Sequence, residues 1–157
     1  MKELITDKGY KKLLEEYEYL VNVKRKEITE NMKTQLSENS SLEENTGLKV
    51  ILEENEFIEK QITKIDEILK NAQVIKNKKG EIDRVIFGST VEIEDLDDET
   101  KTKYTIVGST EIDLDNNKIS YKSPFAQILL NQEKDEELQF SLNNYEKNFI
   151  ITKIYIE

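Results

Sequence analysis

Apolar residues recur at helical spacing through two long segments in the first half of the chain. The first segment runs from Thr6 to about Leu36, and no proline interrupts it. Its regular positions are Tyr10, Leu13, Tyr17 and Leu20, and less regular ones follow at Leu14, Val21, Ile28, Met32 and Leu36. Steps of three and four residues are typical of a helix that packs along one seam against another helix.

The second segment has a cleaner pattern. Its seam positions, again three and four residues apart, are Leu48, Ile51, Asn55, Ile58, Ile62, Ile65 and Leu69. Asn55 is the polar member of this seam, and asparagine in such a place can fix helix register at some cost in stability. Two helices with matching seams predict a coiled coil.

A polar stretch separates the two segments. Residues 37–41 read Ser-Glu-Asn-Ser-Ser, a turn-forming composition, and Ser41 with Glu44 fits the capping box at the start of a helix. We therefore expect the helices to fold back on each other as an antiparallel hairpin, with its tip near residues 38–46. Because the pairing is then intramolecular, a monomer is expected.

Beyond residue 75 the pattern changes from helical to alternating. The strand candidates are Val85–Phe87, Thr90–Ile93, Lys103–Val107, Lys118–Tyr121 and Asn148–Ile156. Ser123 is placed to cap a short helix with Pro124 at its first position. The chain thus predicts an α+β fold in two domains: residues 1–75 form an antiparallel coiled-coil hairpin, and residues 76–157 form a mostly antiparallel β-sheet domain with one short helix.

Composition narrows the chemistry. The 157 residues include 33 acidic and 23 basic ones, and the net charge of −10 disfavours direct binding to a nucleic-acid backbone. Histidine and cysteine are absent, which excludes Cys–His and Ser–His–Asp catalysis and zinc sites of the usual ligands. Any chemistry must come from carboxylates. No stretch approaches the roughly 18 apolar residues that a membrane span needs, so no membrane partner is expected.

Short motifs are distributed over both halves of the chain. They are Leu4-Ile5-Thr6 with Gly9 and Leu13, Leu42-x-Glu44-Asn45, Asn71-Ala72-Gln73-Val74-Ile75, Val85-x-Phe87-Gly88-Ser89-x-Val91, Tyr104-x-Ile106-Val107-Gly108, and Ile119-Ser120 followed by Ser123-Pro124-x-Ala126. In this order and spacing, on a hairpin followed by a sheet, they resemble the GreA/GreB family of bacterial transcript-cleavage factors over essentially the whole length.

The resemblance implies both a fold and a function. The C-terminal domain would be FKBP-like and would dock beside the secondary channel of bacterial RNA polymerase, with Ser123 and Pro124 in the docking surface. The coiled coil would enter the channel, where Arg25 is placed to contact RNA or the channel wall. The tip would then stimulate cleavage of a backtracked RNA 3′ end. The chain would be a cytoplasmic elongation factor and not itself an enzyme, and it would meet DNA only through the polymerase.

The resemblance also implies a metal ion that is present only in the complex. No cofactor is expected on the free protein, because Mg²⁺ belongs to the active centre of the polymerase. Glu44 would be the main tip acid and would help to hold this ion, with Glu43 as a second acid. Carboxylate oxygens are the ligands that Mg²⁺ prefers, so this role needs neither histidine nor cysteine.

The tip departs from the family pattern at Ser41, where the family has an aspartate, while Glu44 keeps the motif's glutamate. A neutral hydroxyl is a weak Mg²⁺ ligand. In one interpretation Glu43 or Glu38 supplies the second carboxylate, although neighbouring helical residues point about 100° apart. In another, the protein is a Gre-like binding-only modulator or inhibitor that does not stimulate cleavage. A third is a coiled-coil protein unrelated to the polymerase.

Overall fold

The structure, a computed structural model, describes residues 2–38 and 46–157. The chain divides into two compact units, which are described separately below. One unit is the helical segment Tyr10–Ala72. The other combines Met1–Gly9 with Gln73–Glu157 and carries the sheet, so its chain is interrupted by the helical unit.

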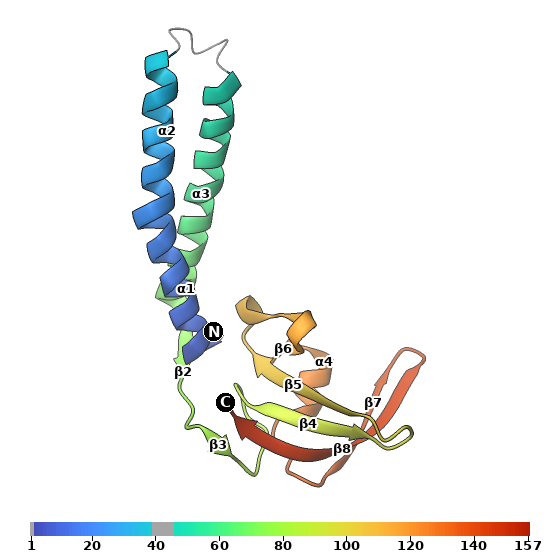
Figure 1. Cartoon of the computed structure of the whole chain (residues 1–157). Coiled ribbons are helices and arrows are strands. Elements are labelled where there is room, and N and C mark those ends of the chain that lie inside the picture. The colour runs from blue at the N-terminus through green and yellow to red at the C-terminus, as the bar shows by residue number, and fades with distance from the viewer. Residues whose placement is uncertain (1, 39–45) are drawn as a thin grey trace. The chain divides into compact units, whose positions relative to one another are not determined.

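The helical unit is a hairpin, as the apolar spacing predicts (Figure 1). Its elements are α1 (Asp7–Tyr19), a π-helical turn η1 (Leu20–Lys24), α2 (Arg25–Glu38) and α3 (Thr46–Asn71). The buried seam contains Leu20, Ile28, Ile58, Ile62 and Ile65, and partly buried apolar residues of both arms pack against it. Asn55 is half-buried on the same seam. Thr6 caps α1, since its Oγ1 accepts a hydrogen bond from the Gly9 backbone N–H at 3.0 Å.

The π-helical turn explains why the first seam becomes irregular after Leu20. A π-turn adds one residue to the helical repeat and so shifts the phase of every residue that follows it. Without the shift, steps of three and four residues from Leu20 and Lys24 would place Glu27 and Asn31 on the seam. Both of these residues are exposed. Instead Ile28 is 2% exposed, and Met32 packs against the same core.

Within the described residues, the second unit contains a two-stranded ladder and a six-stranded sheet. The ladder pairs β1 (Leu4–Thr6) with β2 (Gln73–Ile75) in parallel. The sheet has the order β3-β8-β4-β5-β6, and β7 also pairs with β8. Its strands are β3 (Gly80–Glu81), β4 (Thr90–Asp95), β5 (Lys101–Val107), β6 (Lys118–Ser120), β7 (Glu137–Leu142) and β8 (Tyr145–Ile156). Its pairs are antiparallel except β5–β6, which confirms the predicted α+β class.

One short helix completes the core of this unit. Helix α4 (Pro124–Leu129) buries Ala126 and Leu129 completely against the sheet. The sheet contributes a cluster of β-branched and aromatic side chains from its central strands: Val91, Ile93, Ile106, Phe149, Ile151 and Ile154. The register of β4 against β8 shifts between Glu92 and Ile93. Such an irregularity bends and twists a strand locally.

The predicted strand Val85–Phe87 is not a strand in the structure. Val85 is fully buried, but its backbone pairs with the loop after α4: its N–H donates to Gln132 O at 2.9 Å, and its carbonyl accepts from Asn131 N–H at 2.8 Å. The chain then turns, and Ser89 Oγ donates to Ile86 O at 2.6 Å. The apolar run therefore fills the core as a loop held by hydrogen bonds.

Candidate functional site

The predicted tip acids cannot be placed in the structure. Ser41, Glu43 and Glu44 all lie outside the described residues, so their predicted roles stay predictions. The described arms reach Glu38 at the end of α2 and Thr46 at the start of α3. Glu38, the other acid considered for the tip, is exposed. In the described part of the chain, no group of three or more acidic, histidine or cysteine side chains is arranged to hold a metal ion.

Arg25 forms a bidentate ion pair across the hairpin. Its Nε and Nη2 donate to the two carboxylate oxygens of Glu59 at 2.7 and 2.8 Å, and both side chains are about two-fifths exposed. Hydrogen bonding to Arg25 lowers the pKa of Glu59, and the same contact raises the pKa of Arg25. The fork geometry of guanidinium and carboxylate makes this the strong form of an ion pair. Part of the Arg25 side chain therefore ties α2 to α3, and its predicted contact with RNA or a channel wall stays a prediction.

Ser123 and Pro124 begin helix α4, as predicted. Ser123 Oγ accepts a hydrogen bond from the Ala126 backbone N–H at 3.2 Å, and Pro124 occupies the first helical turn, where no backbone N–H is needed. Pro124 is exposed, while Ala126 is fully buried. The helix is thus anchored by its inner face and presents Pro124 to solvent.

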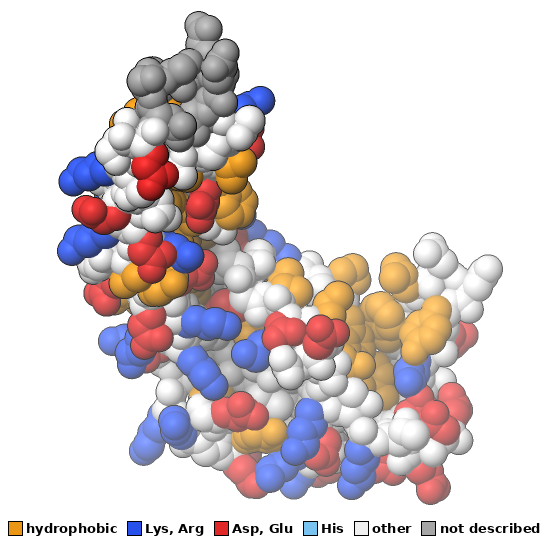
Figure 2. Space-filling model, turned by 45° about the horizontal axis from the view of Figure 1, so that its top comes forward, with side chains coloured by type: hydrophobic (Ala, Val, Ile, Leu, Met, Phe, Trp, Pro, Cys, Tyr) orange, Lys and Arg blue, Asp and Glu red, His pale blue; other side chains and the backbone are white. Residues whose placement is uncertain are grey.

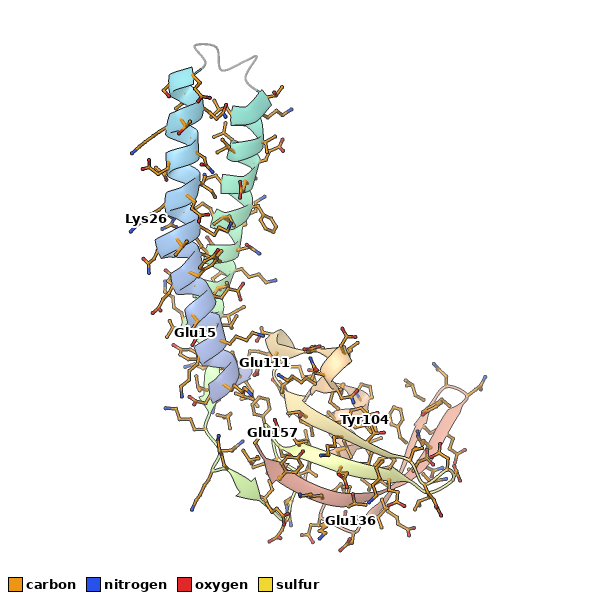
Figure 3. All side chains as sticks on the ribbon, in the orientation of Figure 1. Glu15, Lys26, Tyr104, Glu111, Glu136 and Glu157 are labelled. Atoms are coloured by element: carbon orange, nitrogen blue, oxygen red, sulfur yellow. The ribbon has the colours of Figure 1, made fainter. Side chains whose placement is uncertain are left out.

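An aromatic cavity lies beside this helix start. It has a volume of about 150 Å³ and is lined by Ile93, Asp95, Thr100, Thr102, Tyr104, Phe125, Phe140, Tyr145 and Lys147. Phe125, which follows Pro124, packs edge-on against Tyr104 and Phe140, with ring centroids 5.0 and 5.2 Å apart. Figure 3 shows Tyr104 on β5, and Figure 2 shows hydrophobic side chains gathered on one face of the sheet unit. No local sequence pattern predicts this cavity, because its walls come from five separate segments.

The volume of the cavity indicates what it can hold. Pockets for drug-sized ligands usually measure about 300–1,000 Å³, so 150 Å³ is closer to one protruding side chain. Tyr145 is 55% exposed beside the cavity, and Leu142, its cross-strand neighbour, is 50% exposed. Aromatic walls with an exposed apolar rim are typical of a pocket that receives an anchor residue of a protein partner.

A charged pair forms one wall of the cavity. Lys147 Nζ lies 2.9 Å from Asp95 Oδ2, and the Asp95 side chain is 8% exposed. The Asp97 backbone N–H donates to Asp95 Oδ1 at 2.8 Å. Lys147, followed by this backbone hydrogen bond, holds the pKa of Asp95 below its ordinary value, and Asp95 raises the pKa of Lys147. The carboxylate therefore stays ionised at neutral pH and keeps Lys147 at the rim.

These observations define a class of protein: a helical hairpin inserted into a small α+β unit that carries an aromatic pocket of about the volume of one side chain. Among the residues that the structure places, no helix is long and apolar enough to cross a membrane. The family model "Transcription elongation factor, N-terminal" matches residues 3–74, and the model "Transcription elongation factor, GreA/GreB, C-term" matches residues 78–156. The chain belongs to the GreA/GreB family of transcription elongation factors.

Curated relatives match the sequence of this chain over nearly its full length. The chain is 38% identical to transcription elongation factor GreA of Nautilia profundicola over 99% of this chain and 96% of that protein. It is 39% identical to GreA of Bacillus licheniformis, over 96% and 94% of the two chains. Among solved structures, GreA factor homolog 1 (Gfh1) of Thermus thermophilus is 25% identical, covers 98% of this chain and 99% of its own, and has a TM-score of 0.44.

Proposed function

We propose that this protein binds bacterial RNA polymerase, inserts its hairpin into the secondary channel and stimulates cleavage of backtracked RNA. The observation that carries this proposal is membership of the GreA/GreB family in both halves of the chain, with Glu44 retained in the tip motif. In this role the protein has no active site of its own. Glu44 helps to hold the Mg²⁺ of the polymerase and to orient the attacking water.

The hairpin is suited to reach a distant active centre. Helix α3 has 26 residues and so extends for about 39 Å at 1.5 Å per residue. Its seam is buried against the other arm, and the Arg25–Glu59 ion pair also joins the two arms. A long pair of helices held together in this way is narrow enough to carry acidic residues into a channel.

The sheet unit supplies the docking surface. We place the contact with the polymerase at the start of α4, where Pro124 is exposed, and at the neighbouring aromatic cavity, which Phe125 helps to line. Pro124 and Phe125 both lie on α4, which Ala126 and Leu129 fix in the core. The cavity would accept one apolar side chain of the polymerase, and exposed Tyr145 would cover it.

A transcript-cleavage assay tests the proposal. Backtracked elongation complexes are incubated with Mg²⁺ and with the wild-type protein, Glu44→Ala or Ser41→Asp. We expect the wild type to shorten the RNA faster than the polymerase alone, and we expect Glu44→Ala to abolish this effect while polymerase binding is kept. No cleavage above the intrinsic rate, together with cleavage by Ser41→Asp, would show that the natural protein only occupies the channel.

A further inference from the structure

A half-buried carboxylate joins the N-terminal strand to the corner after β5. Glu111 Oε2 accepts hydrogen bonds from the backbone N–H groups of Thr6 and Gly108, both at 3.0 Å. Its Oε1 accepts from the Thr6 hydroxyl. Figure 3 labels Glu111 in the turn that follows β5. Three donors from two distant segments thus converge on one side chain, a strong arrangement because charge-assisted hydrogen bonds are stronger than neutral ones.

The backbones of these two segments are in direct contact. A Cβ atom added to Gly108 would lie 2.2 Å from the Leu4 carbonyl oxygen, so nothing larger than glycine fits there. Ile5, the central residue of β1, is 1% exposed. Strand β1 is therefore packed directly against the corner at Gly108, and no space is left between the two backbones.

The same corner supports the segment that leads into Ser123. The Tyr121 N–H donates to the Val107 carbonyl at 2.9 Å, and the Ser109 and Ser120 hydroxyls lie 3.4 Å apart. The Ser123 N–H then donates to the Ser120 carbonyl at 2.9 Å. The start of α4 therefore takes its position from the corner that Glu111 fixes.

A second link from β1 reaches this segment directly. Glu3, the residue before β1, accepts from Lys122 Nζ at 2.5 Å, and Lys122 immediately precedes Ser123. The Lys122 ammonium also lies 5.5 Å from the centroid of the Tyr121 ring. Hydrogen bonding within the pair lowers the pKa of Glu3 and raises that of Lys122. Both partners thus stay charged at neutral pH.

We propose that the N-terminal strand is the support of the polymerase-docking segment, and that Glu3 and Glu111 are positioning residues for docking. Glu111 holds the corner at Gly108, and Glu3 holds Lys122, so Ser123 and Pro124 are presented in a fixed conformation. Neither carboxylate is assigned a contact with the polymerase. The inference rests on the proposed docking role of Ser123 and Pro124.

A charge-swap cycle on the Glu3–Lys122 pair tests the proposal. The Kd for RNA polymerase is measured for the wild type, Glu3→Lys, Lys122→Glu and the double variant. We expect each single reversal to weaken binding about fivefold, because like charges then face each other, and the double variant to bind within about twofold of the wild type. Restoration by the swap is a readout that a direct contact of either residue with the polymerase would not give.

The exposed pair Lys153–Glu81, 3.5 Å apart in the same unit, provides the matched control. Lys153→Glu and Glu81→Lys change the net charge by the same amounts, and we expect both to bind like the wild type.

Glu111→Gln keeps the side-chain size but replaces one acceptor oxygen with a donor, and it should weaken binding by about tenfold while the protein stays folded by circular dichroism.

The outcomes separate this inference from the proposed function. If the wild type binds and the Glu3 and Lys122 reversals bind equally well, the positioning role is wrong and the proposed function stands. If the swap is as weak as the weaker single variant, the two residues contact the polymerase directly and the positioning role is again wrong. If the wild type does not bind polymerase, both the proposed function and this inference fail.

Discussion

Arg25 on α2 and Glu59 on α3 form a two-pronged ion pair that links the arms of the hairpin, with donor–acceptor distances of 2.7 and 2.8 Å. The pair follows directly after the π-helical turn, where the seam of the first arm changes phase. Planar guanidinium and carboxylate groups match each other in a way that an ammonium group cannot reproduce. The pair therefore fixes the register of the two arms as well as their contact.

Arg25→Lys should lower the free energy of unfolding of the hairpin, because lysine keeps the charge but loses the two-pronged geometry. Since both side chains are about two-fifths exposed, solvent screening limits the expected loss to about 0.5–1 kcal/mol. Urea unfolding followed by circular dichroism measures it. Lys26→Arg, an exposed neighbour without this contact, serves as the control, and an equal effect of the two substitutions would contradict the role of the pair.

The same pair predicts a dependence of stability on pH. Hydrogen bonding to Arg25 lowers the pKa of Glu59 below its ordinary value of 4.5, so the stability that Glu59 contributes is fully present above about pH 4.5. It is lost as the pH falls through the lowered pKa, because the unfolded state then binds the proton first. The difference in unfolding free energy between the wild type and Glu59→Gln should be constant from pH 6 to 8 and shrink below about pH 4.5. A difference that grows on acidification would contradict this assignment.

Deletion of Asn22 should remove the extra residue of the π-helical turn. An uninterrupted α-helix would then keep Ile28 and Met32 on the seam, because the deletion supplies the one-residue shift that the π-turn makes in the wild type. We therefore expect the deletion to change the unfolding free energy by no more than about 1 kcal/mol, since the core contacts are retained. Asn22→Ala keeps the residue count and should be nearly neutral, since Asn22 is exposed. Thermal unfolding of the two variants side by side checks this, and a much larger loss for the deletion would show that the hairpin needs the π-turn itself.

Tyr145→Ala should weaken polymerase binding without destabilising the sheet unit. Tyr145 is 55% exposed at the rim of the aromatic cavity, so its removal leaves the core intact while the rim is lost. We expect about a tenfold rise in Kd, the usual size for an aromatic anchor at an interface. Leu114, which is 73% exposed and does not line the cavity, supplies the control variant Leu114→Ala. Loss of binding in both variants, or in neither, would exclude the cavity as the docking site.

Two glycines should respond differently to the same added methyl group. At Gly108 a Cβ would meet the Leu4 carbonyl, which is backbone, at 2.2 Å, whereas at Gly47 it would meet the flexible end of Gln35 at 2.8 Å. Gly108→Ala is therefore expected to cost at least about 2 kcal/mol. Gly47→Ala should be neutral or stabilising by up to about 1 kcal/mol, because alanine favours a helix over glycine. Calorimetric melting temperatures compare the two, and a neutral Gly108→Ala would contradict the tight contact with β1.

The long elements could be predicted from the sequence because their periodicity extends over many residues. The seam from Leu48 to Leu69 repeats often enough to define α3, and Ser123-Pro124 marks the start of α4 by its capping chemistry. The π-helical turn corresponds to a visible feature of the sequence, since the first seam loses its regular spacing after Leu20. That irregularity alone does not distinguish an inserted residue from a weaker stripe.

The short elements escaped prediction for physical reasons. Strands β1 and β2 have three residues each, too few to show an alternating pattern, and their pairing joins segments far apart in the sequence. Val85–Phe87 has strand-like composition, but its hydrogen bonds go to the loop after α4. The contacts of Glu111 depend on tertiary proximity to Thr6, 105 residues away, and no local pattern reports them.

The β1–β2 ladder has a consequence for how the arm can vary. Leu4–Thr6 and Gln73–Ile75 pair with each other where the chain leaves and re-enters the sheet unit, so the hairpin is an insertion whose two ends are already fastened together. The sheet unit does not depend on the number of helical turns beyond that ladder. Removing or adding matched heptads in both arms would therefore shorten or lengthen the hairpin, and the sheet unit would keep its fold.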